Sequence, residues 1–427
     1  MYKNLSKQEL SELKAGLENE YESLKSKGLN LDMSRGKPCK EQLDLSNAML
    51  SLDLGDYKSE SGFDCRNYGL MDGIDEAKRL FVSILGVNAD EIIVGGNSSL
   101  QFMYDTVARA MLIGVSEKDE PWSGKKIKFL CPVPGYDRHF AILDTFGIEM
   151  INIPINTNGP DMDMVERLVS EDGGIKGIFC VPMYSNPDGF TYSEETVRRF
   201  AAMKTKAADF RIFWDNAYCV HHLTDTPDTL PNITEECKKA GNPDRAYIFA
   251  STSKITFAGG GLSAMASSKE NIAFIKKQLS IQTIGFDKIN QLRHAKFFTG
   301  DNSVAEHMKK HRAILEPKFD AVCEILEREL ASNGLGEWNK PRGGYFISFN
   351  GLNKTAKRVV ELCKQAGVIL TGAGTTFPHG VDPGDRNIRI APTFPPVNEL
   401  ISAMEVFCAS VKLASAEVLL TEKGVDK

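Results

Sequence analysis

The chain has 427 residues, of which 42% are hydrophobic and 25% charged, so it is long enough for two or three globular domains with buried cores. Its 51 basic and 57 acidic side chains leave a formal net charge of −6, and no long basic tract is present. This balance argues against nucleic acid or an anionic membrane as the main partner.

The first ten residues are polar and heptad-like, unlike a secretory signal peptide. No apolar run is long enough to span a bilayer. The nine cysteines are scattered without CxxC spacing, which favours reduced thiols over a disulfide framework or a structural zinc site. We therefore expect a cytoplasmic protein without a metal ion.

Helical and strand patterns alternate along most of the chain. An amphipathic helix is predicted at 4–27, before an irregular Gly/Pro segment at 31–38. Further helices are predicted at 75–85, 100–113, 138–146, 162–170 and 194–206, and strands at 91–94, 126–131, 150–154, 177–181, 210–214 and 246–250. This alternation predicts an α/β fold with a mostly parallel sheet between helices, and ligands at the carboxyl ends of its strands.

The pattern changes after residue 300. It predicts a long helix through Leu315 and Leu326, strands at 343–349, 368–370 and 387–390, and helices at 354–367 and from 399 to the end. This is an α+β unit that we expect the N-terminal residues to complete. We expect a large domain at 55–315 and a smaller one made of 1–54 and 316–427. The polar insertions at 115–125 and 223–243 carry no evident chemistry.

Lys254 follows a predicted strand and lies in a loop rich in Ser, Thr and Gly, Ser-Thr-Ser-Lys-Ile-Thr-Phe-Ala-Gly-Gly-Gly at 251–261. The amine can form an imine with an aldehyde, and the hydroxyls of Ser251 and Ser253, with the bare amides, can cradle a phosphate. A phosphorylated aldehyde cofactor fits both halves of this loop. A solvated lysine in an ordinary loop is the alternative.

Two other strand ends carry side chains that suit a pyridine-type cofactor. Asp215, in Trp-Asp-Asn-Ala-Tyr, can pair with a ring nitrogen and keep it protonated, while Tyr218 can donate to a ring oxygen. Asn186, in Tyr-Ser-Asn-Pro-Asp-Gly, can donate to the same oxygen from a turn. A capping aspartate and a plain turn remain the alternatives for these motifs.

Two more motifs could bind the phosphate and the ring. Gly-Gly-Asn-Ser-Ser-Leu at 95–100 joins a strand to a helix start, whose free amides attract phosphate, and Ser98 or Ser99 could add a hydroxyl. Tyr136, in Pro-Val-Pro-Gly-Tyr, could stack on a flat ring. A plain helix cap and a packed tyrosine are the alternatives.

Arg389 lies in the apolar run Asn-Ile-Arg-Ile-Ala-Pro, where a guanidinium suits bidentate capture of an α-carboxylate. A structural ion pair is the alternative. Together, the order and spacing of Tyr136, Asn186, Asp215, Lys254 and Arg389 are specific, although each motif alone is weak.

On these motifs, the chain resembles the fold-type I aminotransferases that use pyridoxal 5′-phosphate (PLP), over about residues 30 to 410, and is most similar to a bacterial aspartate aminotransferase branch. The resemblance implies a seven-stranded, mostly parallel mixed sheet in the large PLP-binding domain. It implies ping-pong transfer of an amino group between an L-amino acid and a 2-oxo acid through pyridoxamine phosphate, with aspartate and 2-oxoglutarate as expected substrates.

The resemblance also implies a role for each residue. Lys254 would be the Schiff-base lysine and proton shuttle, Asp215 the partner of the pyridine nitrogen, and Asn186 and Tyr218 the partners of the ring oxygen. The remaining residues would stack on the ring (Tyr136), hold the phosphate (Asn97, Ser98, Ser251), bind the α-carboxylate (Arg389), close over the substrate (Gly36), and reach the phosphate of a neighbouring subunit (Tyr68). The last role implies a homodimer with shared active sites.

One position departs from the family pattern. Where these enzymes usually have a phosphate-binding arginine, eight residues after the lysine, this chain has Leu262 behind three glycines. The amides of 259–261 or another cation could substitute. The cation that would bind a side-chain carboxylate is also open, with Arg35 and Arg138 as candidates and Lys37 behind them.

Other activities fit the same motifs. An aromatic or alanine aminotransferase is the first alternative, and a PLP β-lyase is the second, because a fold does not fix a reaction. A PLP-sensing transcription regulator would require a basic DNA-binding module before the first motif, and we do not expect one.

Overall fold

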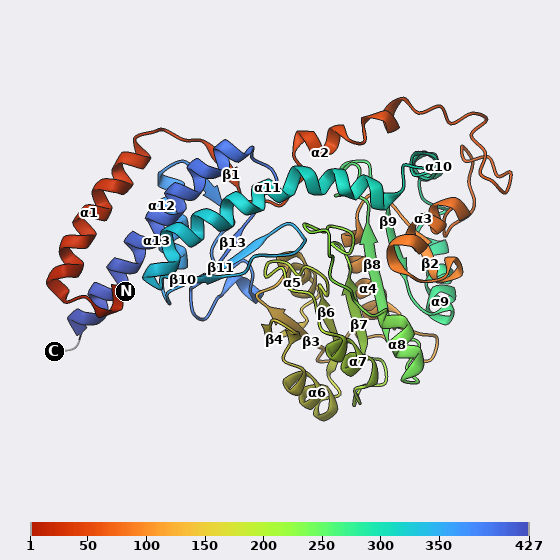
Figure 1. The fold of residues 1–427 in the computed structure, drawn as a ribbon. Coiled ribbons are helices and arrows are strands. Elements are labelled where there is room, and N and C mark those ends of the chain that lie inside the picture. Colours follow the sequence, from red (N-terminus) through yellow and green to blue (C-terminus); the bar gives the residue numbers. More distant parts are fainter. Residues whose placement is uncertain (1, 426–427) are drawn as a thin grey trace.

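The computed structural model describes residues 2–425 (Figure 1). A large sheet with its helices forms one part of the molecule, and the chain ends meet in a smaller part beside it. The long helix α11 (Val304–Leu330) runs along the top of Figure 1 from the first part to the second. The domain boundaries at residues 54/55 and 315/316 remain a prediction.

The large sheet has eight strands in the order β2-β9-β8-β7-β6-β3-β4-β5. Strands β4, β3, β6, β7 and β8 are parallel to their neighbours in this series, whereas β9 is antiparallel to β8 and β2, and β5 is antiparallel to β4. The strands are β2 (Ile92–Val94), β3 (Lys128–Val133), β4 (Glu149–Asn156), β5 (Gly159–Pro160), β6 (Ile175–Cys180), β7 (Arg211–Asp215), β8 (Ala246–Ser251) and β9 (Ser263–Ala266).

Helices cover both faces of this sheet, because its central strands are apolar on both sides. In β7, Ile212 and Trp214 pack into one core, and Phe213 between them packs into the other. The first core is shared with α3 (Asp75–Leu85), α6 (Met162–Glu171), α7 (Glu194–Ala202) and α8 (Ile233–Lys239). The second core is shared with α4 (Ser99–Leu112), α5 (Asp137–Thr145) and α9 (Lys269–Gln282). Helix α10 (Lys288–Phe297) packs on α3.

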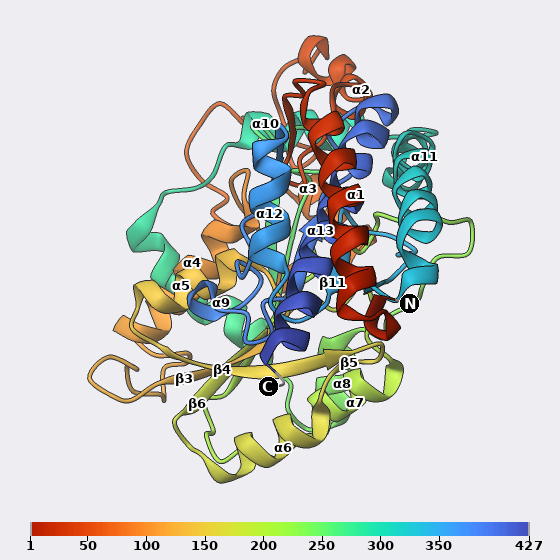
Figure 2. The same cartoon turned by 90° about the vertical axis from the view of Figure 1, so that its left-hand side faces the viewer.

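The smaller part joins the two ends of the chain. Helix α1 (Lys7–Lys25) packs along α13 (Val397–Val425), as Figure 2 shows. An antiparallel sheet of β10 (Gly336–Trp338), β11 (Ile347–Gly351) and β13 (Asn387–Ile390) lies with them, as does the parallel pair β1 (Leu31–Met33) and β12 (Val368–Leu370). Helices α2 (Lys40–Asp44) and α12 (Ala356–Gln365) complete the described helices. The pairing of β1 with β12 explains why this unit needs the N-terminal residues.

The α/β fold with a second α+β unit is confirmed. The sheet has the seven strands that the family resemblance implied, six of which the sequence pattern located, and in addition the two-residue β5. Helix α8 lies inside 223–243, which we expected to be a polar insertion; its apolar residues Ile233 and Cys237 are spaced four apart and are buried. Strand β9 consists of Ser, Ala and Met residues and carries no β-branched signal, so the sequence pattern did not indicate it.

Within 2–425, no helix combines the length and apolar character needed to cross a membrane. In the same range, no group of three or more His, Cys, Asp or Glu side chains is arranged to hold a metal ion.

Candidate active site

The predicted site residues meet at one edge of the large sheet. Asp215 is the last residue of β7, Asn186 follows β6, and Lys254 follows β8. Because these three strands are neighbours and parallel, their carboxyl ends bring the three side chains together. Tyr136 reaches the same edge from the end of β3.

Two adjoining cavities open at this edge, and both are lined by Tyr136, Asn186, Tyr218 and Lys254. The inner cavity, of about 270 Å³, also has Asn97, Ser98, Ser99, Asp215, Ser251 and Ser253 in its wall. The outer cavity, of about 440 Å³, also has Arg35, Gly36, Lys37, Arg138, Phe346 and Arg389 in its wall. Lys254 therefore stands between an inner cavity lined by hydroxyls and an outer cavity lined by cations.

Lys254 is held among aromatic rings. Its Nζ lies 5.1 Å from the ring centre of Tyr218 and 5.7 Å from that of Tyr345. Burial lowers the pKa of the Lys254 ammonium below its usual value, and the carboxylate of Asp215 opposes this shift. A lysine with a lowered pKa in an enclosed cavity can serve as a nucleophile and as a base.

The loop that carries Lys254 is fixed from behind. The hydroxyl of Thr252 accepts a hydrogen bond from the amide of Leu262 at 2.8 Å, and the amide of Thr252 donates to the carbonyl of Leu262 at 2.7 Å. Leu262 itself is buried in the apolar core. Its side chain therefore has no part in anion binding, and it closes the loop.

Asp215 is buried and has one protein partner. Its Oδ2 lies 3.0 Å from Nε2 of His139, which stacks on Phe179 with ring centres 4.4 Å apart. The other carboxylate oxygen, Oδ1, is buried without a hydrogen-bond partner. An unpaired buried carboxylate oxygen is costly, so this atom is suited to a donor that the protein itself does not supply.

Asn186 is presented by a tight turn between Ser185 and Phe190. The amide of Ser185 donates to the carbonyl of Phe190 at 2.8 Å, and that of Gly189 to the carbonyl of Ser185 at 2.7 Å. Gly189 has φ of +72°, and a Cβ there would lie 2.6 Å from Pro341, so the turn requires glycine. The turn leaves Asn186 buried at the cavity wall.

Arg389 forms the ion pair that was the alternative interpretation of its motif, and it also lines the outer cavity. Its Nη1 donates to Oδ1 of Asn186 at 3.2 Å and pairs with Oδ1 of Asp137 at 3.1 Å, and its guanidinium lies 4.8 Å from the ring centre of Phe346. Its Nε is buried without a partner. Because Asn186 accepts through its oxygen, its amide nitrogen remains available as a donor toward the cavity.

The inner wall is suited to an anion despite the absence of an arginine. Ser98 caps α4 without a side-chain bond to the helix, so its hydroxyl does not occupy the first amides of that helix. Ser253 donates to the carbonyl of Asn97 at 2.6 Å, which joins the two segments. Among the described residues that line this cavity, Lys254 is the one cation, and 259–261 do not contribute.

The outer wall holds the N-terminal segment against the small sheet. A Cβ on Gly36 would lie 2.5 Å from Phe346, so only glycine permits this approach. Arg35 and Arg138 line the cavity and are exposed; Arg138 lies 3.9 Å from Asp137.

Tyr68 lies apart from these residues within the single chain. Its side chain is 78% exposed and lines neither cavity. Sequence analysis missed three residues that do contact the site: His139, Asp137 and Tyr345. His139 follows Tyr136 by three positions, a helical spacing that could have indicated it; Asp137 and Tyr345 carry no such signal.

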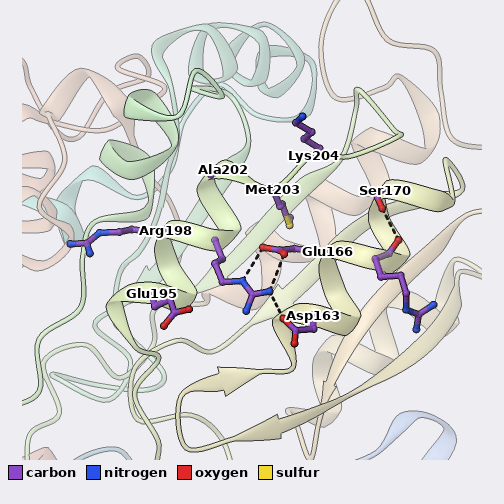
Figure 3. Close-up of a pocket in the computed structure, with 10 residues that line it drawn as sticks. Asp163, Glu166, Ser170, Glu195, Arg198, Ala202, Met203 and Lys204 are labelled. Atoms are coloured by element: carbon purple, nitrogen blue, oxygen red, sulfur yellow. Dashed lines mark hydrogen bonds and ion pairs between the residues drawn. The ribbon is translucent and has the colours of Figure 1, made fainter.

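A wider groove lies elsewhere, between α6 and α7 (Figure 3). It is lined by charged side chains, of which Arg199 pairs with Asp163 at 2.6 Å and with Glu166 at 2.9 Å. None of the residues that line it lines the two cavities at Lys254. In this groove Arg199 is therefore paired with two carboxylates of the wall, and the groove is separate from the candidate site.

The doubly covered sheet and a lysine loop facing an aspartate at the strand ends agree with the class that the motifs resemble, the fold-type I aminotransferases. A sequence model of the family described as "Aspartate amino-transferase" matches residues 5–423. The chain therefore belongs to the aspartate aminotransferase family, as its motifs predicted, and it is a transaminase.

Individual relatives agree with this assignment. An aspartate aminotransferase of Corynebacterium glutamicum is 46% identical over 403 residues, covering 94% of this chain and 93% of the relative. The crystal structure of an aspartate transaminase from the same species is similar with a TM-score of 0.95 and 44% identity, covering 98% of this chain and 99% of that one. The α-aminoadipate aminotransferase LysN of Thermus thermophilus, at 16% identity, a TM-score of 0.73 and coverage of 91% and 93%, shares the fold.

Proposed function

We propose that this protein is a PLP-dependent aspartate aminotransferase that passes the amino group of aspartate to 2-oxoglutarate. The observation that carries the proposal is the meeting of Lys254, Asp215 and Asn186 around one cavity, with Arg389 in the wall of the adjoining cavity. The two Corynebacterium glutamicum proteins named above are called aspartate aminotransferase and aspartate transaminase, which supports aspartate as the substrate.

The residues of the inner cavity fit PLP. The unpartnered Oδ1 of Asp215 matches a protonated ring nitrogen, and the free amide of Asn186 and the hydroxyl of Tyr218 match the ring oxygen. The α4 N-terminus with Ser98, Ser99 and Ser251 suits the phosphate. When bound, PLP supplies an aldehyde that condenses with amines and a ring that accepts the electrons released from the amino acid's α-carbon.

Lys254 then has two roles. Its amine would hold the cofactor covalently at rest, and it would move the proton from the amino acid's α-carbon once an amino acid has replaced it. Burial supports the second role, because a lowered pKa leaves more of the amine in the neutral form that accepts a proton. Its place between the two cavities gives it access to both cofactor and substrate.

The outer cavity would select the substrate. Arg389, with its unpartnered Nε, would bind the α-carboxylate, and this carboxylate would compete with Asp137 for the guanidinium. A dicarboxylic amino acid requires a second cation. Arg35 and Arg138 are in the cavity wall and exposed, so either can turn toward a side-chain carboxylate. Gly36 would carry Arg35 over the substrate.

We also propose a homodimer in the cytoplasm. Exposed apolar side chains lie on α4, α9 and the adjacent loops: Tyr68, Leu70, Tyr104, Leu112, Ile281 and Ile284. These segments lie against one another. Gln282 donates a hydrogen bond to Asp105 at 3.0 Å, and Gly285 packs so closely on Gly69 that a Cβ at 285 would lie 2.9 Å from the Gly69 carbonyl oxygen. A second copy would cover this surface and receive Tyr68. The nine cysteines are free, which suits a reducing compartment.

A donor panel tests the activity. The purified enzyme is given PLP and 2-oxoglutarate with aspartate, alanine, phenylalanine or tyrosine, and glutamate formation is measured. We expect aspartate to give the highest kcat/KM. A higher kcat/KM for another amino acid would contradict aspartate as the preferred donor. Formation of pyruvate and ammonia without any 2-oxo acid would indicate a lyase.

Co-expression tests the shared site. One chain carries Lys254→Ala and the other Tyr68→Phe, so a mixed dimer has one site with Lys254 and an intact neighbouring tyrosine. We expect mixed dimers to recover activity that Lys254→Ala dimers lack and that Tyr68→Phe dimers have only weakly. No gain in the mixed dimers would contradict shared sites.

A further inference from the structure

A buried polar cluster lies directly behind Lys254, outside both cavities. Its members are Gln42 of α2, His307 and His311 of α11, and Tyr345 just before β11. All four side chains are at most 1% exposed. The two histidines contact the backbone carbonyl of Ile255, Tyr345 contacts that of Lys254, and Gln42 contacts His311 and Tyr345.

Gln42 has one possible orientation in this cluster. Its Oε1 accepts a hydrogen bond from the backbone amide of Cys39 at 3.1 Å, so its Nε2 must face the other two partners. That nitrogen lies 3.0 Å from Nδ1 of His311 and 2.9 Å from the hydroxyl oxygen of Tyr345. Its two N–H groups are therefore donated, one to each partner.

These two bonds determine where the partners carry their protons. Nδ1 of His311 accepts, so the neutral ring has its proton on Nε2, which lies 2.9 Å from the carbonyl oxygen of Ile255. The hydroxyl oxygen of Tyr345 also accepts, so its proton is free to point at the carbonyl oxygen of Lys254, 3.4 Å away. Burial favours the neutral His311 ring.

His307 adds a second donor to the same carbonyl. Its Nε2 lies 2.9 Å from the oxygen of Ile255 and 3.2 Å from Nε2 of His311. Two ring N–H groups can share one carbonyl, because that oxygen has two lone pairs. The carbonyl of Ile255 is thus held by two side chains of α11, while the carbonyl of Lys254 is held by Tyr345, from the segment before β11.

We propose that Gln42 is a positioning residue for Lys254: by fixing the tautomer of His311 and the hydroxyl of Tyr345, it ties the Lys254 backbone to the N-terminal segment that lines the substrate cavity. Gln42 follows that segment, Ser34 to Lys37, by five residues. A shift of this segment over the substrate is then transmitted to the amine. The catalytic consequence rests on the proposed function, but the proton arrangement does not.

The proton arrangement is tested without cofactor or substrate. The cofactor-free protein is labelled with ¹⁵N-histidine, and the His311 ring signals are assigned by their loss in His311→Gln. We expect the Nε2–H tautomer in the wild type and a mixture of tautomers in Gln42→Met, which keeps the length of the side chain but removes both donors. An Nδ1–H tautomer in the wild type would overturn the proposal.

The catalytic consequence is tested with Gln42→Met beside Asn271→Leu. Asn271 is a matched control, since it is also buried and donates two amide hydrogens, to the carbonyl of Asp244 and the hydroxyl of Ser267. We expect Gln42→Met to lower kcat about tenfold or more with KM changed less than about threefold, because small displacements of a reacting group are costly. We also expect the pH at which visible absorption of the PLP-loaded enzyme changes to move in Gln42→Met and not in Asn271→Leu. Equal kcat and equal titrations in the two variants would refute the positioning role.

If Gln42→Met does not fold, Tyr345→Phe tests the same cluster with a smaller change, because it removes only one hydroxyl. Its matched control is Tyr21→Phe, where the hydroxyl of a buried tyrosine donates to the carbonyl of Leu362 at 2.8 Å. We expect Tyr345→Phe alone to lower kcat, and its effect to be less than additive with Gln42→Met. Full additivity would show that the two residues act separately. If the tautomer result holds while no transamination is found, the cluster stands and the proposed function fails.

Discussion

Asp215 and His139 are joined by a single 3.0 Å bond between Oδ2 and Nε2, and both are buried, while Oδ1 of the same carboxylate has no protein partner. Oδ2 is thus held by His139, and Oδ1 is available to a hydrogen-bond donor that the protein does not supply, such as a bound ligand. This relationship suits the carboxylate to hold a proton on the ring nitrogen of a bound cofactor.

Replacing that carboxylate should impair catalysis more than folding. In Asp215→Asn the amide cannot hold a ring proton, so we expect kcat to fall at least about a hundredfold, within the usual range for losing a positioned electrostatic partner. Asp209→Asn is a suitable control, because Asp209 is a partly buried carboxylate that pairs with Lys176 and Trp122. Steady-state kinetics of the two variants test this prediction. Similar kcat values for Asp215→Asn and Asp209→Asn would contradict the role of Asp215.

Arg389 should act mainly on substrate affinity. Arg389→Lys keeps the charge and removes the fork geometry, so we expect KM for the amino acid to rise about tenfold or more, equivalent to about 1.4 kcal/mol. Arg386→Lys, three residues away and paired with exposed Glu337, should leave KM unchanged. The assignment to the α-carboxylate would be wrong if Arg389→Lys changed kcat alone.

Arg35 and Arg138 should determine preference for a dicarboxylic substrate. One of these arginines would bind the side-chain carboxylate of aspartate. We expect its replacement to lower kcat/KM for aspartate by about ten- to a hundredfold, because a hydrogen bond between charged groups is lost, and to change kcat/KM for alanine little. Arg35→Ala, Arg138→Ala and the control Arg167→Ala, from the α6/α7 groove, can be compared with both donors. If neither of the first two changes the aspartate-to-alanine ratio, the second cation comes from elsewhere, for example Lys37 or a partner subunit.

Buried histidines should make the fold sensitive to acid. Burial lowers the pKa of His294 and of His311 to about 4, whereas an unfolded histidine has a pKa near ~6.5. Below about pH 6.5 these histidines are therefore protonated in the unfolded chain but not in the folded one. The free energy of unfolding consequently falls as the pH falls from about 6.5 towards 4. The loss can reach about 3 kcal/mol for each group.

Urea unfolding at about pH 7 and about pH 4.5 measures this loss. We expect the loss of stability between the two pH values to be smaller in His294→Gln than in the wild type, whatever the stability of the variant at neutral pH. His379→Gln is the control, because its side chain is 63% exposed. An unchanged pH dependence in His294→Gln would show that His294 does not contribute.

Site residues that a short sequence motif marks could be predicted. Contacts between residues far apart in the sequence could not. Lys254 and Asn186 follow apolar strands and Asp215 ends one, so the parallel pairing of these strands brings the three residues to one edge. The bond of His139 to Asp215 joins residues 76 positions apart, and that of Arg389 to Asn186 joins residues 203 apart. Such contacts depend on how the helices and the second unit pack on the sheet, which no local pattern specifies.

The same limit applies to secondary structure. Asp75–Leu85 was predicted to the residue, because its helical period is strong and Gly86 ends it in a left-handed conformation. Strand β9 was not predicted, because its buried residues at 263–266 are Ser, Ala and Met, which carry no β-branched or aromatic strand signal. Leu262 was recognised as a departure from the family pattern, but only the structure reveals that it is core and closes the Lys254 loop.

The most direct measurement is chemical labelling of the lysine itself. The purified enzyme loaded with PLP is reduced with borohydride, digested and analysed by mass spectrometry, beside Lys254→Ala treated in the same way. We predict a pyridoxyl phosphate group on the peptide that contains Lys254, loss of that label and more than about a thousandfold loss of turnover in Lys254→Ala. An unmodified Lys254, a label on another lysine, or near-normal turnover in the variant would contradict the account.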